Sequence, residues 1–347
     1  MKITRLERTV VVVPFIPGIL PPPDYEEATP GYPQPLGERR QDIVRLHTDD
    51  GAVGKGMGGP YFGRRDLEEP DLVGRDPLEF EPRSLGGGPW DMALLDLIGQ
   101  AVGWPLYRLF GGKARDRVPV DYWISRMGPE DTAAAATRAA AQGFHGIKMK
   151  CKWEDANVAD RVFAAHEAAP DLRIVVDPNE RFHTVENTLS LARELEGLDV
   201  IFEDPIPKGD SLAPYQRLVA EIPFPVAPHL QNPRQAIEAV HLKAADALNI
   251  GPAGWGFLDI ARIAEAADIP VWQASNVDVG LHDAFRAHAS AACPNCTLGS
   301  DLCGNFVHEH SLLAEPLVRD GCVTVTDRPG LGVDLDEEAV QRYAVDP

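Results

Sequence analysis

The chain has 347 residues, of which 44% are hydrophobic and 25% charged, as in an ordinary globular protein. This length favours a large barrel or two domains over one minimal core. The 53 acidic and 33 basic residues give a formal charge of −20, which argues against nucleic-acid and anionic-membrane partners. An acidic surface also repels small anions, so a carboxylate site would need local positive charge from lysines or a metal ion.

The N-terminal region has the pattern of an α+β unit. Residues 3–13 predict a strand, and residues 43–56 predict a hairpin that turns at Asp50 and Gly51. Apolar residues at helical spacing predict one helix over residues 88–110, which ends at two glycines.

A segment rich in proline and glycine separates the first strand from the hairpin. Residues 14–40, which include Tyr25, form a loop that either caps a pocket or lies on the surface. We expect this loop and the turn at residues 56–64 to set substrate specificity.

After Asp116 the chain alternates short apolar runs with longer amphipathic segments, which is typical of a parallel sheet. The predicted strands are 118–123, 146–150, 173–177, 200–203, 224–228, 247–250, 270–274 and 297–299. The predicted helices between them are 130–142, 154–168, 185–195, 212–220, 234–242, 257–267 and 281–292. Eight strands with seven helices fit a (β/α) barrel better than an open sheet.

The opening residues lack the zones of a signal peptide, and no apolar run is long enough to cross a bilayer. Five cysteines do not suggest a disulfide framework. We therefore expect a cytoplasmic protein without a membrane partner.

Polar residues follow consecutive predicted strands, whose C-terminal ends converge on one face of a barrel. The second strand ends in Lys148 and Lys150, the third in Asp177, the fourth in Glu203, and the fifth near His229. Side-chain alternation puts both lysines on the inward face, where each ammonium disfavours protonation of the other. At least one lysine could therefore act as a base near neutral pH.

Asp177 and Glu203 would be neighbouring like charges, an arrangement that a divalent metal ion stabilises. Each residue alone also has a simpler interpretation. A strand-end lysine is commonly solvated, a single acid often caps a helix, and a lone histidine is often structural. Their joint appearance on consecutive strand ends favours a functional site.

Several motifs resemble the enolase superfamily, in its mandelate racemase and muconate lactonizing branch. They are MKITRLE, DLIGQAVGWPLYRLFGG, Lys148-Met149-Lys150, VVDPNERF, FEDPIP, ALNIGPAGWGF and PGLGVDLDEEAV. The resemblance implies an α/β fold with a (β/α)7β barrel over residues 115–317. It also implies an α+β capping domain from residues 1–114, completed by residues from about 318 to 347.

The resemblance further implies Mg2+ bound by Asp177 and Glu203. In this family the metal binds a substrate carboxylate, a base removes the neighbouring α-proton, and the metal stabilises the enediolate. Lys150 would be the base, and Lys148 would tune it and contact the carboxylate. Tyr25, Asn179 and Trp123 are the candidate contacts to a small carboxylate substrate, and the family resemblance suggests a homo-oligomer.

Three positions depart from the family pattern. His229 stands where the family has a third acidic metal ligand, and imidazole would favour Mn2+ or another divalent metal. Gly251 stands where one branch carries a lysine after the sixth strand. After the seventh strand, where another branch carries a histidine, the nearest acid is Asp278.

A single evident base favours a lyase that dehydrates an acid sugar or related hydroxy-carboxylate, with Asp278 or His229 as proton donor. Racemisation, epimerisation or cycloisomerisation is the alternative, with Asp278 as the second group. A catalytically impaired homologue that binds a ligand is a further alternative, because fold does not fix function.

Overall fold

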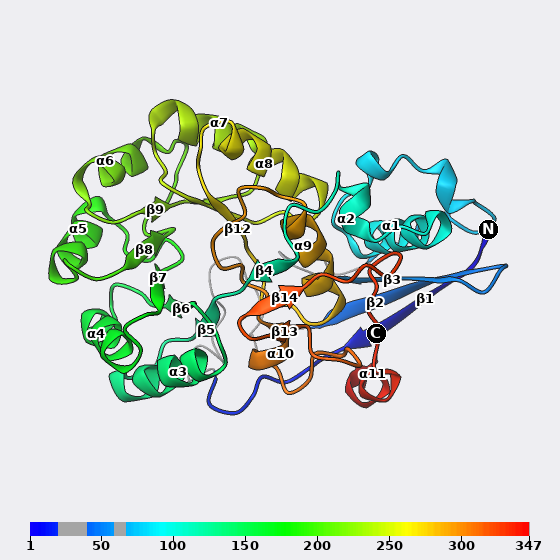
Figure 1. Ribbon diagram of the computed structural model, residues 1–347, viewed down its shortest axis with the longest axis horizontal. Coiled ribbons are helices and arrows are strands. Elements are labelled where there is room, and N and C mark those ends of the chain that lie inside the picture. The colour runs from blue at the N-terminus through cyan, green and yellow to red at the C-terminus, as the bar shows by residue number, and fades with distance from the viewer. Residues whose placement is uncertain (20–39, 59–66, 347) are drawn as a thin grey trace.

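The computed structural model describes residues 1–19, 40–58 and 67–346, so Tyr25 and most of the two predicted specificity loops lie outside the described residues (Figure 1). An antiparallel sheet of order β15-β1-β2-β3 lies to one side of the barrel. Its strands are β1 (Ile3–Val11), β2 (Gln41–Thr48), β3 (Val53–Gly58) and β15 (Ala344–Val345). The predicted hairpin is confirmed, because β2 pairs with β3 across the turn.

Helix α1 (Pro89–Val102) packs against β3, and glycine makes this close approach possible. A Cβ atom on Gly56 would lie 2.9 Å from the carbonyl carbon of Pro89. The prediction of one continuous helix was wrong, since α1 ends at Gly103 in the left-handed region (φ 68°). Helix α2 (Leu106–Leu109) begins after a proline, whose ring cannot continue a regular helix.

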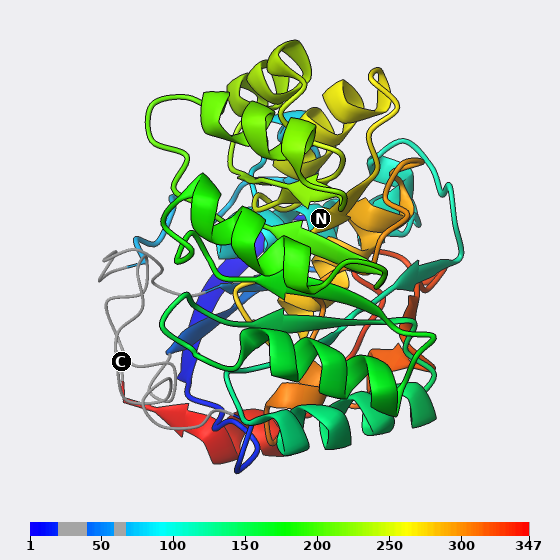
Figure 2. The same cartoon turned by 90° about the vertical axis from the view of Figure 1, so that its left-hand side faces the viewer.

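The barrel consists of two parallel sheets surrounded by helices, and the predicted fold class is confirmed (Figures 1 and 2). The sheet β5-β6-β7-β8-β9 contains Tyr122–Ile124, Gly146–Lys150, Arg173–Asp177, Val200–Glu203 and Val226–Ala227. The sheet β10-β11-β12 contains His229–Leu230, Leu248–Ile250 and Val271–Gln273. Helices α3 to α9 are Pro129–Ala141, Val158–Ala168, Val185–Glu194, Ala213–Glu221, Pro233–Leu242, Trp255–Glu265 and Leu281–Ala291.

Three predicted strands are interrupted or absent in the described structure. The first divides into β4 (Arg117–Pro119) and β5, and the fifth divides at Pro228, which has no backbone N–H for a ladder. The predicted strand 297–299 is absent from the described structure. There the barrel closes through isolated parallel bridges that join Cys296 to Val271 and Ser300 to Val120.

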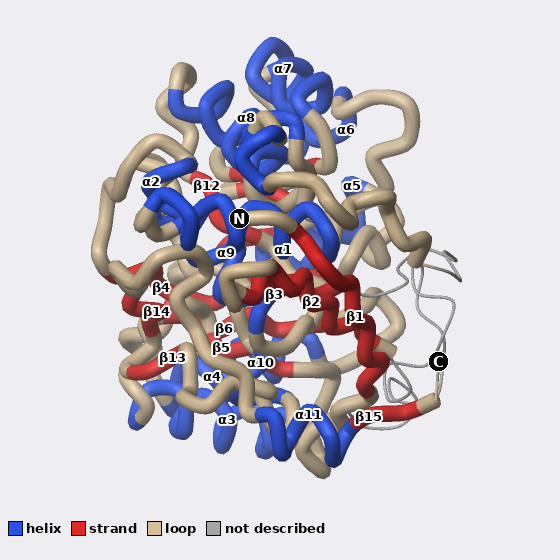
Figure 3. Tube along the Cα trace, turned by 90° about the vertical axis from the view of Figure 1, so that its right-hand side faces the viewer, coloured by secondary structure: helices blue, strands red, loops and turns tan. Residues whose placement is uncertain are grey.

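The C-terminal segment contacts both parts of the molecule. Strand β13 (Val318–Arg319) pairs with β14 (Cys322–Thr324), which pairs with β4 at the start of the barrel. Farther along, α11 (Glu337–Tyr343) leads into β15, which pairs with β1 (Figure 3). The short helices η3 (Pro77–Glu79), η4 (Pro82–Ser84) and α10 (Gly304–Val307) lie in the connections.

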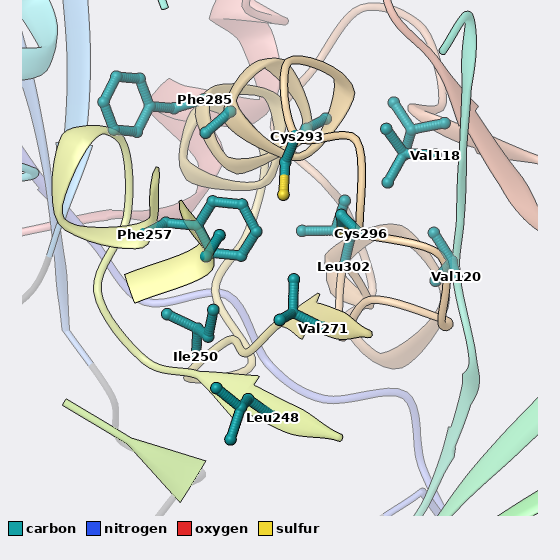
Figure 4. Packing of buried hydrophobic residues seen from close by; sticks show 14 of the residues in the cluster. Val118, Val120, Leu248, Ile250, Phe257, Val271, Phe285, Cys293, Cys296 and Leu302 are labelled. Carbon is teal, nitrogen blue, oxygen red and sulfur yellow. The ribbon is translucent and has the colours of Figure 1, made fainter. Parts of the chain in front are cut away.

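Apolar side chains fill both faces of the strands. Leu248, Ile250 and Val271 lie with Phe257 and Phe285 of the surrounding helices in the main core (Figure 4). A separate buried cluster combines residues from successive strands, namely Val175, Ile201, Ala227, Ala247 and Trp272. Because side chains alternate along a strand, this second cluster belongs to the barrel interior and leaves the C-terminal strand ends for polar groups.

Within the described residues, no helix has both the length and the apolar character needed to cross a membrane.

Buried Asp96 connects three segments. Its carboxylate accepts hydrogen bonds from the backbone N–H of Lys55 (2.9 Å) in β3 and of Leu331 (2.8 Å) near the C-terminus. Gly330 (φ 70°) lies directly against it, and a Cβ atom there would be 2.8 Å from the Asp96 carbonyl oxygen.

We predict that Gly330→Ala lowers the free energy of unfolding by about 1–3 kcal/mol more than Gly74→Ala. Both glycines have positive φ, but no atom lies within 4 Å of a Cβ on Gly74, so only Gly330 adds a steric clash. Denaturant unfolding of both variants measures the difference. Equal losses would show that the contact with Asp96 does not constrain this loop.

Candidate active site

A buried cluster of lysines and acids lies at the C-terminal ends of the strands. Lys148 Nζ donates to Glu203 Oε1 (2.7 Å) and Asp301 Oδ2 (2.6 Å) and lies 3.1 Å from Asp177 Oδ2. Lys150 Nζ contacts Asp177 Oδ2 and donates to Asn179 Oδ1 (2.9 Å). Two lysines and two acids predicted from the sequence thus lie together, and Asn179 is beside them.

The carboxylates control the charge of Lys148. Burial alone would lower the pKa of this lysine, but Asp301, Glu203 and Asp177 together raise it well above its usual value. We expected a neighbouring ammonium to lower the pKa of a lysine, so that this lysine could act as a base near neutral pH. For Lys148 this expectation fails. Its side chain remains a cation and is unsuited to act as a base.

The two predicted metal-binding acids respond differently to burial. Burial raises the pKa of Asp177, but the ammonium groups of Lys150 and Lys148 outweigh it and lower that pKa below its usual value. Burial and the charge of Asp177 together raise the pKa of Glu203 well above its usual value. The two acids therefore differ, since the lysines favour the ionised form of Asp177 whereas ionisation of Glu203 would gain from an additional cation.

Asp301 and Asn249 are site residues that the sequence analysis missed. The backbone N–H of Asp301 donates to Gln273 O (2.9 Å), which places this acid at the end of the closing segment of the barrel. Asn249 of β11 donates to Glu203 Oε1 (2.7 Å) and lies 3.3 Å from Asp301 Oδ2. Asp301 follows the predicted strand 297–299 by two residues, so examination of the eighth strand end would have found it.

The predicted three-ligand metal site is only partly present. The described residues contain no group of three His, Cys, Asp or Glu side chains placed to hold a metal ion, so Asp177, Glu203 and His229 are not assembled as one. Two carboxylates nevertheless fit a divalent cation. Glu203 Oε2 is buried and has no hydrogen-bond partner within the described chain, and carboxylate oxygens are the ligands that Mg2+ prefers.

His229 lies near the lysines and is uncharged. Burial and the charges of Lys148 and Lys208 lower the pKa of His229 to about 3. Its backbone N–H donates to Asp204 Oδ1 (3.1 Å), and its ring Nε2 lies 3.0 Å from Gln231 Nε2. Because the imidazolium form is not populated near neutral pH, the expectation that His229 protonates a leaving group as an acid is not supported.

Asp278, the other predicted proton donor, is fully buried beside helix α9. Its Oδ2 lies 3.1 Å from a guanidinium nitrogen of Arg286 and 3.2 Å from His282 Nδ1. The structure therefore pairs this carboxylate with side chains of α9.

Trp123 lies next to Lys148 across the pairing of β5 with β6. It packs with Phe15, Cys303 and Val307 and lines a cavity of about 680 Å³. The predicted substrate contact is thus beside the lysine cluster, although most of its surface is buried by apolar neighbours.

Residues 131–339 match the family model described as Enolase C-terminal domain-like, which covers more than half of the chain. The L-Lys-D/L-Arg epimerase of Methylococcus capsulatus is 32% identical over 84% of this chain and 90% of that protein. This chain belongs to the enolase superfamily. Its mandelate racemase and muconate lactonizing branch, indicated by the sequence motifs, is likewise confirmed.

Other similar members of the enolase superfamily catalyse different reactions. The 3,6-anhydro-alpha-L-galactonate cycloisomerase of Streptomyces coelicolor is 35% identical over 74% of this chain and 71% of that protein. The cis-3-hydroxy-L-proline dehydratase of Roseibium aggregatum is 25% identical over 87% and 91%, respectively. The crystal structure of N-succinyl Arg/Lys racemase from Bacillus cereus has a TM-score of 0.83, with 22% identity over 100% of this chain and 99% of that chain, which shows the shared fold. The relatives are therefore enzymes whose names include both isomerases and a lyase.

Asp283 makes stability depend on pH. This α9 residue is buried and accepts a hydrogen bond from the backbone N–H of Gly304 (2.9 Å). Burial and the charge of Asp278 raise the pKa of Asp283 from 3.8 to about 8. The folded protein thus retains a proton that the unfolded chain releases, and the free energy of unfolding falls as pH rises between about 4 and 8.

We predict that Asp283→Asn removes this contribution to the pH dependence, because the amide resembles the protonated acid and keeps an oxygen for Gly304. The variant should be more stable than the wild type at pH 8, and the difference should shrink toward pH 4. Urea unfolding across this range measures the effect. Parallel curves for the two proteins would refute the shifted titration.

Proposed function

We propose that this enolase superfamily protein is a lyase that uses Lys150 to remove the α-proton of a small hydroxy-carboxylate and then eliminates its β-hydroxyl. The observation that supports this proposal is that the two lysines lie in different environments. Three carboxylates hold Lys148 as a cation, whereas Lys150 contacts one carboxylate and one amide and is more exposed. Lys150 is thus the lysine suited to exchange a proton with a substrate.

The proposed elimination is balanced within the substrate and Lys150. The neutral amine takes the α-proton, the electron pair of that C–H bond forms a carbon–carbon double bond, and the β-carbon–oxygen bond breaks. The resulting Lys150 ammonium returns a proton to the departing hydroxide, which leaves as water. One group can perform both transfers if both bonds lie on the same face of the substrate.

The other residues would position the substrate and balance its charge. Lys148 supplies a fixed positive charge near the substrate carboxylate, and Asn179 orients the Lys150 amine through its side-chain oxygen. Asp177 and Glu203 would hold a divalent cation, Mg2+ or Mn2+. When bound, that ion would stabilise the negative charge that develops on the substrate carboxylate.

Epimerisation or cycloisomerisation is the second candidate function. Named isomerases are 32% and 35% identical to this chain, whereas the named dehydratase is 25% identical. A protein that binds a ligand without turnover is a third candidate, motivated by the incomplete three-ligand metal group.

We predict that Lys150→Met lowers α-proton exchange by roughly 100-fold or more, because it removes the base. NMR in D2O, with Mg2+ and a panel of acid sugars, would measure both deuterium incorporation and loss of water. Lys152→Met is the matched control, since Lys152 is on the same segment but outside the cluster. Equal exchange by wild type and Lys150→Met would refute the base assignment, whereas exchange without loss of water would favour the isomerase.

Removal of divalent metal should abolish this exchange, because the negative charge on the substrate would lose its stabilisation. Activity should vanish in EDTA and return with Mg2+ or Mn2+ added in excess of the chelator. Full activity in EDTA after extensive dialysis against chelator would contradict the proposed role of the metal.

A further inference from the structure

A side-chain amide covers Gly251, which directly follows β11. A Cβ atom on Gly251 would lie 2.5 Å from Gln231 Oε1 and 2.7 Å from Gln231 Cδ. The carboxamide therefore lies directly over Gly251. Any larger residue at position 251 would have to displace it.

Gln231 and His229 form a hydrogen-bonded pair held by the backbone. An amide nitrogen only donates, so Gln231 Nε2 donates to His229 Nε2 (3.0 Å) and the ring proton lies on Nδ1. Gln235 Oε1 accepts from the backbone N–H of Gln231 (2.7 Å), and Asp204 Oδ1 accepts from that of His229 (3.1 Å). Both backbone positions are thus anchored beside the site.

The pair adjoins the lysine cluster. His229 pairs with Asn249 across β10 and β11, and Asn249 in turn donates to Glu203. A substrate held at Lys150 would therefore extend toward His229 and Gln231.

The pair offers both hydrogen-bond donors and an acceptor but no charge. His229 Nδ1–H and the second amide hydrogen of Gln231 are donors, and Gln231 Oε1 is an acceptor with no partner in the described part of the chain. A hydroxyl group both donates and accepts, so it matches this set. A carboxylate only accepts, so it would leave the Gln231 acceptor without a partner, and Gly251 offers it no side chain.

We propose that Gln231 and His229 bind a distal hydroxyl group, and that the substrate is consequently a polyhydroxylated monocarboxylate and not a dicarboxylate. This inference rests on the proposed proton abstraction by Lys150. It makes Gln231 a residue that determines specificity by hydrogen bonding, while the chemistry takes place at the other end of the substrate.

Sugar monoacids and diacids of the same configuration provide the test. The wild-type protein with Mg2+ in D2O would be incubated with each member of three pairs, and NMR would measure the incorporation of α-deuterium. The pairs are D-gluconate and D-glucarate, D-galactonate and galactarate, and D-xylonate and xylarate. We expect exchange with at least one monoacid, at a kcat/KM at least tenfold above that of its diacid. A diacid that exchanges as well as its monoacid would overturn the specificity while leaving the function of Lys150 intact. No exchange in either set would count against both proposals.

For the preferred monoacid, Gln231→Leu should raise KM at least tenfold and change kcat less than threefold, because it removes binding groups and leaves Lys150 in place. Gln216→Leu is the control, since Gln216 is an exposed glutamine on helix α6. Thermal unfolding of both variants would check that the fold is intact. An unchanged KM in a folded Gln231→Leu protein, or a loss confined to kcat, would contradict a binding role for the amide.

Discussion

The charge balance around Lys148 is the constraint on which the site depends. Asp177, Glu203 and Asp301 come from three separate segments of the barrel and lie together with almost no access to water. Buried carboxylates repel one another, and a buried charge without a partner is strongly destabilising. The Lys148 ammonium lowers this repulsion, and the unpartnered oxygen of Glu203 leaves a position for a further cation.

This constraint gives the two lysines of β6 different surroundings, although they are two residues apart on the same face. Lys148 contacts three carboxylates, which keep its side chain positively charged. Lys150 lies at the strand end, where it contacts Asp177 and Asn179 and can meet a substrate. On the side formed by β10 and β11, Gly251 and the Gln231 carboxamide provide uncharged groups. This asymmetry supports our proposal that the chemistry takes place at one face of the substrate.

The sequence predicts most of this arrangement because strand ends of a parallel barrel converge whatever the details of the loops. Strands β6, β7 and β8 have the predicted bounds, and their terminal lysines and acids meet. The same rule applies to Asp301, which follows the predicted eighth strand by two residues although an isolated bridge at Ser300 replaces that strand in the structure. The partners of Asp278 and His229 depend on side chains from α9 and from Gln231, which strand spacing does not reveal.

Crystals of the protein soaked in Mn2+ would test the account most directly, through the anomalous scattering of the metal. We predict one strong anomalous peak bound by carboxylate oxygens of Asp177 and Glu203, with Lys150 beside it and His229 outside the coordination sphere. A peak bound by His229, or a site that avoids both acids, would contradict the assignment of the cation site and the proton abstraction built on it.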